Sequence, residues 1–195
     1  MNDVLNAIKG RRSVRAYKDT KVSKEDINTL VEAGMYGPCG ISMKDRRFTA
    51  IINEDVVKKV NETLRQTFLH MEVNENTPPI MKQMKENAKK EDANFLYNAP
   101  ALIIVSVNDD DDFGESNAAV SLENMMIAAI SLDLETCWLN QLTRLNDIPS
   151  IKSLKKELDI PDDHRIYGTL AVGYGAMTPG EESSAVKKSS LKMFE

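Results

Sequence analysis

The sequence predicts an α+β domain in which helices cover a sheet, and three observations support this class. Residues 101–107, ALIIVSV, form a continuous apolar run that is typical of a strand buried on both faces. Stretches with helical periodicity alternate with this run and with shorter apolar segments. No repeat, low-complexity tract or linker divides the 195 residues, so we expect a single domain over 1–195.

The first part of the chain predicts helices that alternate with one strand. A short helix around residues 4–8 is expected to end at Gly10, because glycine often ends a helix. Residues 23–26 have the pattern of a capping box, and the apolar stripe of the helix that follows reaches Met35. A strand over 47–53 and a helix over 56–68 come next.

Residues 71–94 form an excursion that is polar and charged around Pro78 and Pro79, with a helix expected after the prolines. Such a segment inside a compact domain is often a lid over a site or an arm at an interface, and the sequence leaves both readings open.

The second part of the chain predicts buried elements. After the apolar run we expect a buried helix over 118–132, a strand over 136–139, an amphipathic helix over 151–158 and a strand over 166–172. A polar tail follows Tyr174.

Composition and charge indicate a soluble cytoplasmic protein. The net charge of -5 argues against nucleic acid or an anionic membrane as the main partner. Two cysteines give no disulfide framework and fit a reducing compartment. The first residues lack the pattern of a secretory signal, and the most apolar stretch, 118–132, is too short to span a bilayer.

Several common site chemistries find no support in the motifs. His70 and His164 lack the spacing of metal ligands, and the acidic run 109–112 lacks the later ligands of a calcium loop. No GxSxG serine is present, and the glycines at 173 and 175 lack the third glycine of a dinucleotide loop. We therefore expect no metal ion and no catalytic acid, base or nucleophile from the protein.

Polar residues interrupt the apolar helix over 118–132. Met125 and Met126 are best explained as core packing. Glu123 and Asn124 are expected to be buried, and buried polar groups need partners. They either tie the core together or lie behind a ligand, and the sequence does not decide between these.

The strongest local signal is a basic cluster that follows the first helix. Three guanidiniums surround a hydroxyl, in Arg11, Arg12, Ser13 and Arg15. Such forked donors suit a phosphate dianion, although a solvated basic turn would have the same composition. A second basic pair, Lys187 and Lys188, lies near the other end of the chain, and sequence spacing does not show that the two clusters meet.

The order of these motifs resembles the nitroreductase-like FMN family. The pieces are RRSVRAY at 11–17, a Gly-Pro-Cys-Gly loop at 37–40, NAPALIIVSV at 98–107, SLENMMIAAISLDLETCWLNQL at 121–142 and IYGTLAVGYG at 166–175. The likeness covers nearly the whole chain, from about Val4 to Lys188. It implies a mostly antiparallel central sheet covered by helices, and an intertwined homodimer that holds two FMN molecules at the subunit interface.

The resemblance also implies the cofactor contacts. Contacts to the FMN phosphate and ribityl chain fall to Arg11, Arg12, Ser13 and Arg15, and Arg15 also extends towards the pyrimidine end of the ring. Lys187 or Lys188 matches the basic tail that completes the phosphate site. The loop along the ring, usually from the other subunit, corresponds to Pro38, Cys39, Gly40 and Ser42. The segment beside the reactive face of the ring corresponds to Leu139, Asn140 and Gln141.

This chain departs from the family pattern around the ring. Relatives usually have Pro-Ser, then Asn, Gln and a Pro-Trp pair, where this chain has Pro38-Cys39 followed by Ser42 and a charged stretch at 44–46. Asp133-Leu134-Glu135 replaces a usual Gly-Leu-Gly. The ring environment and the substrate pocket are therefore expected to differ from those of typical relatives.

The resemblance implies an oxidoreductase that works in two steps. NADH or NADPH gives a hydride to FMN and leaves, and an electron-poor acceptor such as a nitroaromatic or a quinone then takes the electrons, with ping-pong kinetics. The altered loop at 42–46 motivates an alternative, a flavin-binding module with little turnover that serves as a store, sensor or scaffold. Reductive dehalogenation and flavin breakdown rank below both, because no residue points to them.

Overall fold

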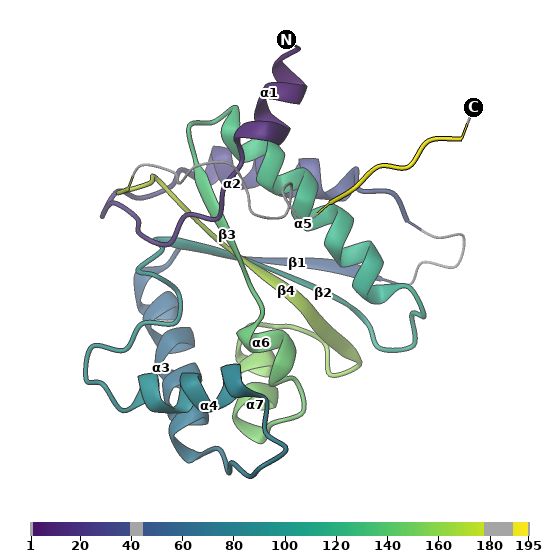
Figure 1. Ribbon diagram of the computed structural model, residues 1–195. Coiled ribbons are helices and arrows are strands. Elements are labelled where there is room, and N and C mark those ends of the chain that lie inside the picture. The colour runs from purple at the N-terminus through teal and green to yellow at the C-terminus, as the bar shows by residue number, and fades with distance from the viewer. Residues whose placement is uncertain (1, 40–44, 178–188, 195) are drawn as a thin grey trace.

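A computed structural model describes residues 2–39, 45–177 and 189–194. Its centre is a four-stranded sheet in the order β1-β2-β4-β3, and every neighbouring pair of strands is antiparallel. The strands are β1 (Arg46–Ile51), β2 (Ala101–Asn108), β3 (Glu135–Leu139) and β4 (His164–Gly173). Helices lie on both faces of this sheet (Figure 1), so the predicted α+β class with an antiparallel sheet is confirmed.

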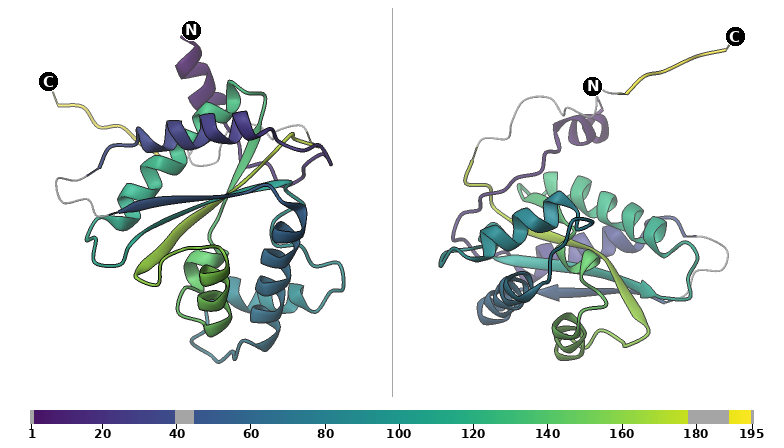
Figure 2. Two further views of the ribbon diagram at one scale, coloured as in Figure 1. Left: turned by 180° about the vertical axis from the view of Figure 1, so that it is seen from behind. Right: turned by 60° about the horizontal axis from the view of Figure 1, so that its bottom comes forward.

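The helices form two layers around the sheet. They are α1 (Asp3–Gly10), α2 (Lys24–Met35), α3 (Glu54–His70), α4 (Pro79–Ala88), α5 (Gly114–Ile130), α6 (Gln141–Arg144) and α7 (Pro149–Glu157). Helices α2 and α5 cover one face, and α3, α4, α6 and α7 lie on the other (Figure 2). Helix α1 stands away from both layers (Figure 1).

Strand β2 divides the core in two. Ala101, Ile103, Val105 and Val107 pack with α2 and α5, whereas Leu102 and Ile104 pack with α3 and α7. The strand is buried along its whole apolar run, as predicted, because both of its faces meet a helical layer.

The predicted helix boundaries at the start of the chain are confirmed. Helix α1 ends at Gly10. The backbone N–H of Asp26 donates to Ser23 Oγ at 2.9 Å, and the Ser23 hydroxyl donates to the Asp26 carboxylate at 2.7 Å. Helix α5 begins at Gly114, earlier than the predicted 118, because Gly114 donates its backbone N–H to Asp111 O and closes a turn there.

Helix α5 corrects one prediction about its polar residues. Glu123 is exposed in this chain, so the expectation that it would be buried is wrong. The helical period places Leu122, Met125 and Met126 inside and turns position 123 outward. Asn124 is half-buried, and its side-chain amide donates to Ala33 O at 3.1 Å, which ties α5 to α2.

The excursion at 71–94 contains the helix expected after the prolines. Helix α4 begins with Pro79, which fits the first turn because that position needs no backbone N–H. Met81 and Met84 pack against the core cluster that includes α3, and Lys85 donates to Met71 O. The excursion therefore folds back on its own chain.

No helix within the described ranges is long and apolar enough to cross a membrane.

Candidate functional site

The arginine segment runs beside the start of β3. The backbone N–H of Val14 donates to Thr136 O at 3.0 Å, and Lys18 N–H donates to Tyr174 O at 2.8 Å. Val14 and Tyr17 are buried and anchor the segment, while Ser13 and Arg15 stay exposed. The sequence therefore folds here into an irregular extension of the sheet that presents arginines along its edge.

The three arginines differ in how they are held. Arg11 follows the last residue of α1, and its backbone N–H donates to Ala7 O at 2.9 Å. The Arg12 guanidinium donates to Lys9 O at 2.7 Å and to Arg11 O at 2.8 Å, and Arg15 donates to Ser13 O at 3.3 Å.

No described carboxylate forms an ion pair with Arg11 or Arg15. Guanidiniums that no acid neutralises retain their full attraction for an anion. Of the two readings that the sequence left open, this geometry favours an anion-binding segment over an ordinary basic turn.

Arg15 and the segment at 139–141 line the same pocket, whose volume is about 180 Å³. Leu139 ends β3 and is buried, Asn140 is exposed, and Gln141 begins α6. Phe68 of α3 and side chains of α4 also line this pocket. Residues that are distant in the sequence, and that were predicted to contact one cofactor, are thus brought together.

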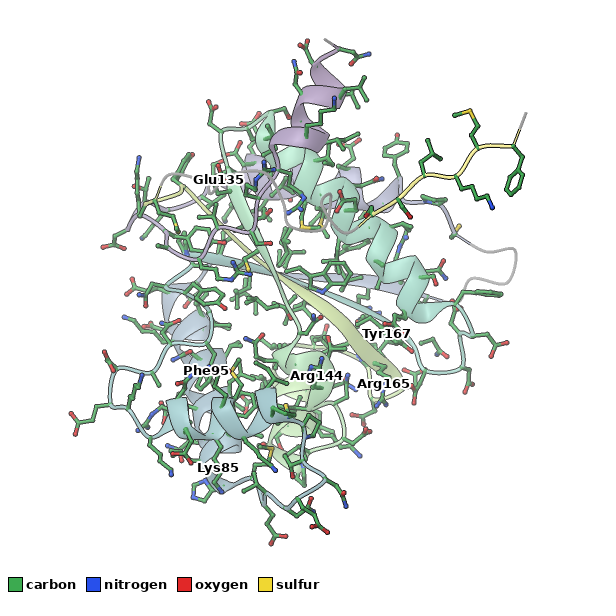
Figure 3. All side chains as sticks on the ribbon, in the orientation of Figure 1. Lys85, Phe95, Glu135, Arg144, Arg165 and Tyr167 are labelled. Atoms are coloured by element: carbon green, nitrogen blue, oxygen red, sulfur yellow. The ribbon has the colours of Figure 1, made fainter. Side chains whose placement is uncertain are left out.

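Gln141 has an unsatisfied side-chain oxygen. Its Nε2 donates to Phe95 O at 3.4 Å, whereas its Oε1 is buried and has no donor among the described residues. Figure 3 labels Phe95, which lies near α4 and α6, on the same face of the sheet as Arg144. Because buried acceptors are normally paired, this oxygen indicates a place for a ligand N–H or for water.

Two ionisable groups near the arginines, the Cys137 thiol and the Tyr17 phenol, are uncharged at neutral pH. Burial raises the pKa of the Cys137 thiol, and the nearby Arg15 and Arg11 lower it by less. Burial also raises the pKa of the Tyr17 phenol, whose oxygen lies 2.9 Å from Val14 O. Both groups are therefore protonated at neutral pH, and neither adds a negative charge beside the arginines.

Only the first two residues of the predicted ring loop, Pro38 and Cys39, lie within the described part of the chain. Pro38 and Cys39 are exposed and do not line the pocket that Arg15 shares with 139–141. Gly40 and Ser42 of the same loop, and Lys187 and Lys188 of the tail, lie outside the described residues.

Arg46 anchors the approach to this loop and was not recognised from the sequence. Its guanidinium donates to Met35 O at 3.0 Å, Gly37 O at 3.3 Å, Asn117 O at 3.1 Å and Ser121 Oγ at 2.6 Å. Partial burial lowers the pKa of this guanidinium, which still remains charged at neutral pH. A single cation therefore fastens the end of α2 to α5, just before Pro38.

Tyr97 also lines the pocket and was also missed. Its φ of 57° and the φ of 58° at Asn98 lie in the left-handed region. The Asn94 side chain holds this turn by accepting the backbone N–H of Leu96 at 2.9 Å and of Asn98 at 3.1 Å. Strain of this kind concentrates at functional sites, and the asparagines around Tyr97 were the only sequence signal for it.

No three His, Cys, Asp or Glu side chains come together to hold a metal ion within residues 2–39, 45–177 and 189–194.

The protein is an α+β domain in which an arginine-rich segment lies beside a pocket lined by aromatic side chains. Such a site suits a flat cofactor that carries a phosphate. The model of the Nitroreductase family matches residues 8–174, which is most of the chain. The protein therefore belongs to the nitroreductase family, a family of oxidoreductases, and the resemblance found in the sequence is confirmed.

Known structures and proteins agree with this assignment. A nitroreductase with bound FMN from Bacteroides fragilis is 32% identical, with a TM-score of 0.89 and full coverage of both chains. A Methanothermobacter thermautotrophicus protein named "Putative NADH dehydrogenase/NAD(P)H nitroreductase" is 27% identical over 91% of this chain and 80% of its own. An iodotyrosine deiodinase from Thermotoga neapolitana is 26% identical over 89% of each chain.

Proposed function

We propose that the protein binds FMN and passes electrons from NADH or NADPH to an electron-poor acceptor such as a nitroaromatic or a quinone. The observation that carries this proposal is that Arg15 and the segment at 139–141 line one pocket. Arg11 lies near enough to Cys137, which lines the same pocket, for its charge to lower the pKa of that thiol. The bound FMN of the Bacteroides fragilis nitroreductase and the name of the Methanothermobacter relative support the cofactor and the reductant.

The residues present fit FMN. Arg11, Arg12 and Ser13 offer donors and positive charge to its phosphate and ribityl chain. The buried Gln141 Oε1 has no hydrogen-bond donor among the described residues, and the pyrimidine ring of the flavin carries an N–H that could donate to it. In this proposal Pro38, Cys39, Gly40 and Ser42 of the partner subunit cover the ring, and Lys187 or Lys188 completes the phosphate site.

FMN supplies the chemistry, since it accepts a hydride from a nicotinamide and releases two electrons to a second substrate. The role of the protein chain is to bind FMN and to adjust its reactivity. Arg15 places a positive charge at the pocket, which stabilises the negative charge that a reduced flavin carries. Phe68 and the methionines of α4 exclude water from the same pocket.

Exposed apolar residues support a second copy of the chain as a partner. Helix α1 has no buried residue, and Val4, Leu5 and Ile8 are about half-exposed. Leu191 and Phe194 of the tail are more than 80% exposed. Because apolar groups gathered at the surface mark interfaces, we infer a homodimer in which the chain ends cover the partner. Sedimentation equilibrium is expected to give twice the chain mass, and a monomer at micromolar concentration would contradict the inference.

Replacing Arg11 with alanine is expected to weaken FMN binding by about 2 kcal/mol, roughly a 30-fold rise in Kd, because a charge-assisted contact to the phosphate is lost. Fluorescence titration of the protein with FMN measures this change. Arg47→Ala is the matched control, since Arg47 lies on β1, the edge of the sheet opposite β3. An unchanged FMN affinity in the Arg11 variant would remove Arg11 from the site.

Steady-state kinetics test the two-step order of the reaction. When the nicotinamide leaves before the acceptor binds, double-reciprocal plots at several acceptor concentrations are parallel. Converging lines would indicate that both substrates bind together, and they would contradict the ping-pong scheme.

A further inference from the structure

Helix α4 gives the candidate pocket a wall of adaptable apolar side chains. Ile80, Met81 and Met84 line the pocket together with the aromatic rings of Phe68 and Tyr97. Methionine is flexible and polarisable, and its sulfur makes favourable contacts with aromatic rings. Such a wall suits a flat aromatic molecule and tolerates some variation in its substituents.

The charged side chains that line this pocket are all positive. Its lining residues include Arg15 and Arg144 and no carboxylate, although the whole chain has a net charge of -5. The adjoining pocket, reached past Met84 and Tyr97, adds Lys90 and Asp92, which offset each other. A cationic pocket in an acidic protein selects for an anionic ligand.

Arg144 is the cation of this pocket that the proposed FMN contacts leave unassigned. It is the last residue of α6 and is exposed, and no described carboxylate forms an ion pair with it. Figure 3 shows Arg144 beside α6, on the side of the sheet where α4 also lies. Arg15 is assigned to FMN, so Arg144 remains available to a second ligand in the same pocket.

We propose that Arg144 binds a carboxylate on a planar aromatic electron acceptor whose ring packs against Met81 and Met84. This inference rests on the proposed function, because it identifies the acceptor class of that site. A guanidinium forks two N–H donors towards a carboxylate and fixes its orientation as well as its position. The contact makes the site prefer an acidic aromatic acceptor to a neutral one of the same shape.

Binding of unreactive analogues tests the contact apart from turnover. Benzoate and benzamide have nearly the same shape and differ in charge. Calorimetric titration of the oxidised, FMN-loaded protein is expected to show benzoate binding about tenfold more tightly than benzamide. Arg144→Gln should remove this preference and leave benzamide unchanged, while Arg47→Gln should retain it. Equal affinities in the wild-type protein would overturn the proposal.

The oxidative half-reaction gives a second readout. Holoenzyme reduced with one equivalent of dithionite is mixed with 4-nitrobenzoate or 4-nitrobenzamide, and the return of the flavin absorption is followed. The nitro group takes two electrons and two protons and becomes a nitroso group and water. We expect about a tenfold preference for 4-nitrobenzoate that Arg144→Gln abolishes without slowing the amide. A variant that slows both acceptors equally would overturn the specific role.

Failure of this inference and failure of the proposed function give different results. Dithionite bypasses the nicotinamide, so a flavin that NADPH and NADH do not reduce contradicts the proposed function and leaves the acceptor test intact. If Arg144→Gln slows reduction by NADPH but not oxidation by 4-nitrobenzoate, the guanidinium binds a phosphate of the reductant and the carboxylate proposal is wrong.

Discussion

Phe68→Ala is expected to lower the free energy of unfolding by about 3–5 kcal/mol, because a large buried ring is replaced by a methyl group. Phe68 is 1% exposed, and its ring centroid lies 4.9 Å from that of Phe95. It joins α3 to the loop before β2, and its edge forms part of the pocket that Arg15 also lines. The truncation therefore leaves a cavity where the core meets the candidate site.

Urea unfolding at a fixed protein concentration measures this loss. Phe68→Leu is the matched variant, since it retains much of the apolar volume and is expected to cost far less. Equal urea midpoints for the alanine variant and the wild-type protein would show that the Phe68 ring is not packed as described.

Arg46→Met is expected to lower the free energy of unfolding by about 2–3 kcal/mol, because it leaves several partly buried acceptors without their donor. The four acceptors come from the end of α2, from Gly37 and from the first half of α5. Methionine preserves most of the apolar stem, so the loss reports on the guanidinium and not on packing.

The adjacent Arg47 provides the control. Its side chain is 43% exposed and forms an ion pair with Asp45 at 3.8 Å, so Arg47→Met is expected to cost less than about 1 kcal/mol. Urea midpoints of the two variants should therefore differ clearly. Equal midpoints would show that Arg46 does not fasten the loop that leads to Pro38.

The parts of the fold that depend on local patterns could be predicted from the sequence. The end of α1 at Gly10 and the cap at Ser23 each depend on residues within one helical turn. The burial of β2 followed from its unbroken apolar run. Glu123 was misjudged because a strongly apolar helix was taken as buried on all sides, whereas its outer face is exposed in this chain.

The parts of the site that depend on distant partners could not be predicted. In the sequence, Arg46 was only part of a stretch that departs from the family pattern. Its anchoring role could not be predicted, because its acceptors are mainly the backbone carbonyls of residues 35, 37 and 117, which no local pattern connects to it. The role proposed for Arg144 depends on α6 and α4 lining the same pocket, which no local sequence pattern shows. Arg11 and Arg15 could be proposed from the sequence because the cluster is dense and the family motif is specific, and their contacts to FMN stay a prediction.

The most direct test of the proposed function is an anaerobic titration of the FMN-loaded protein with NADPH and then with NADH, followed at the flavin absorption band. We expect one or both nicotinamides to bleach the band rapidly, because in the proposed site the flavin lies in the pocket that the cationic Arg15 lines. A bound flavin that stays oxidised with both nicotinamides would contradict the proposed reductase and would favour a flavin-binding module.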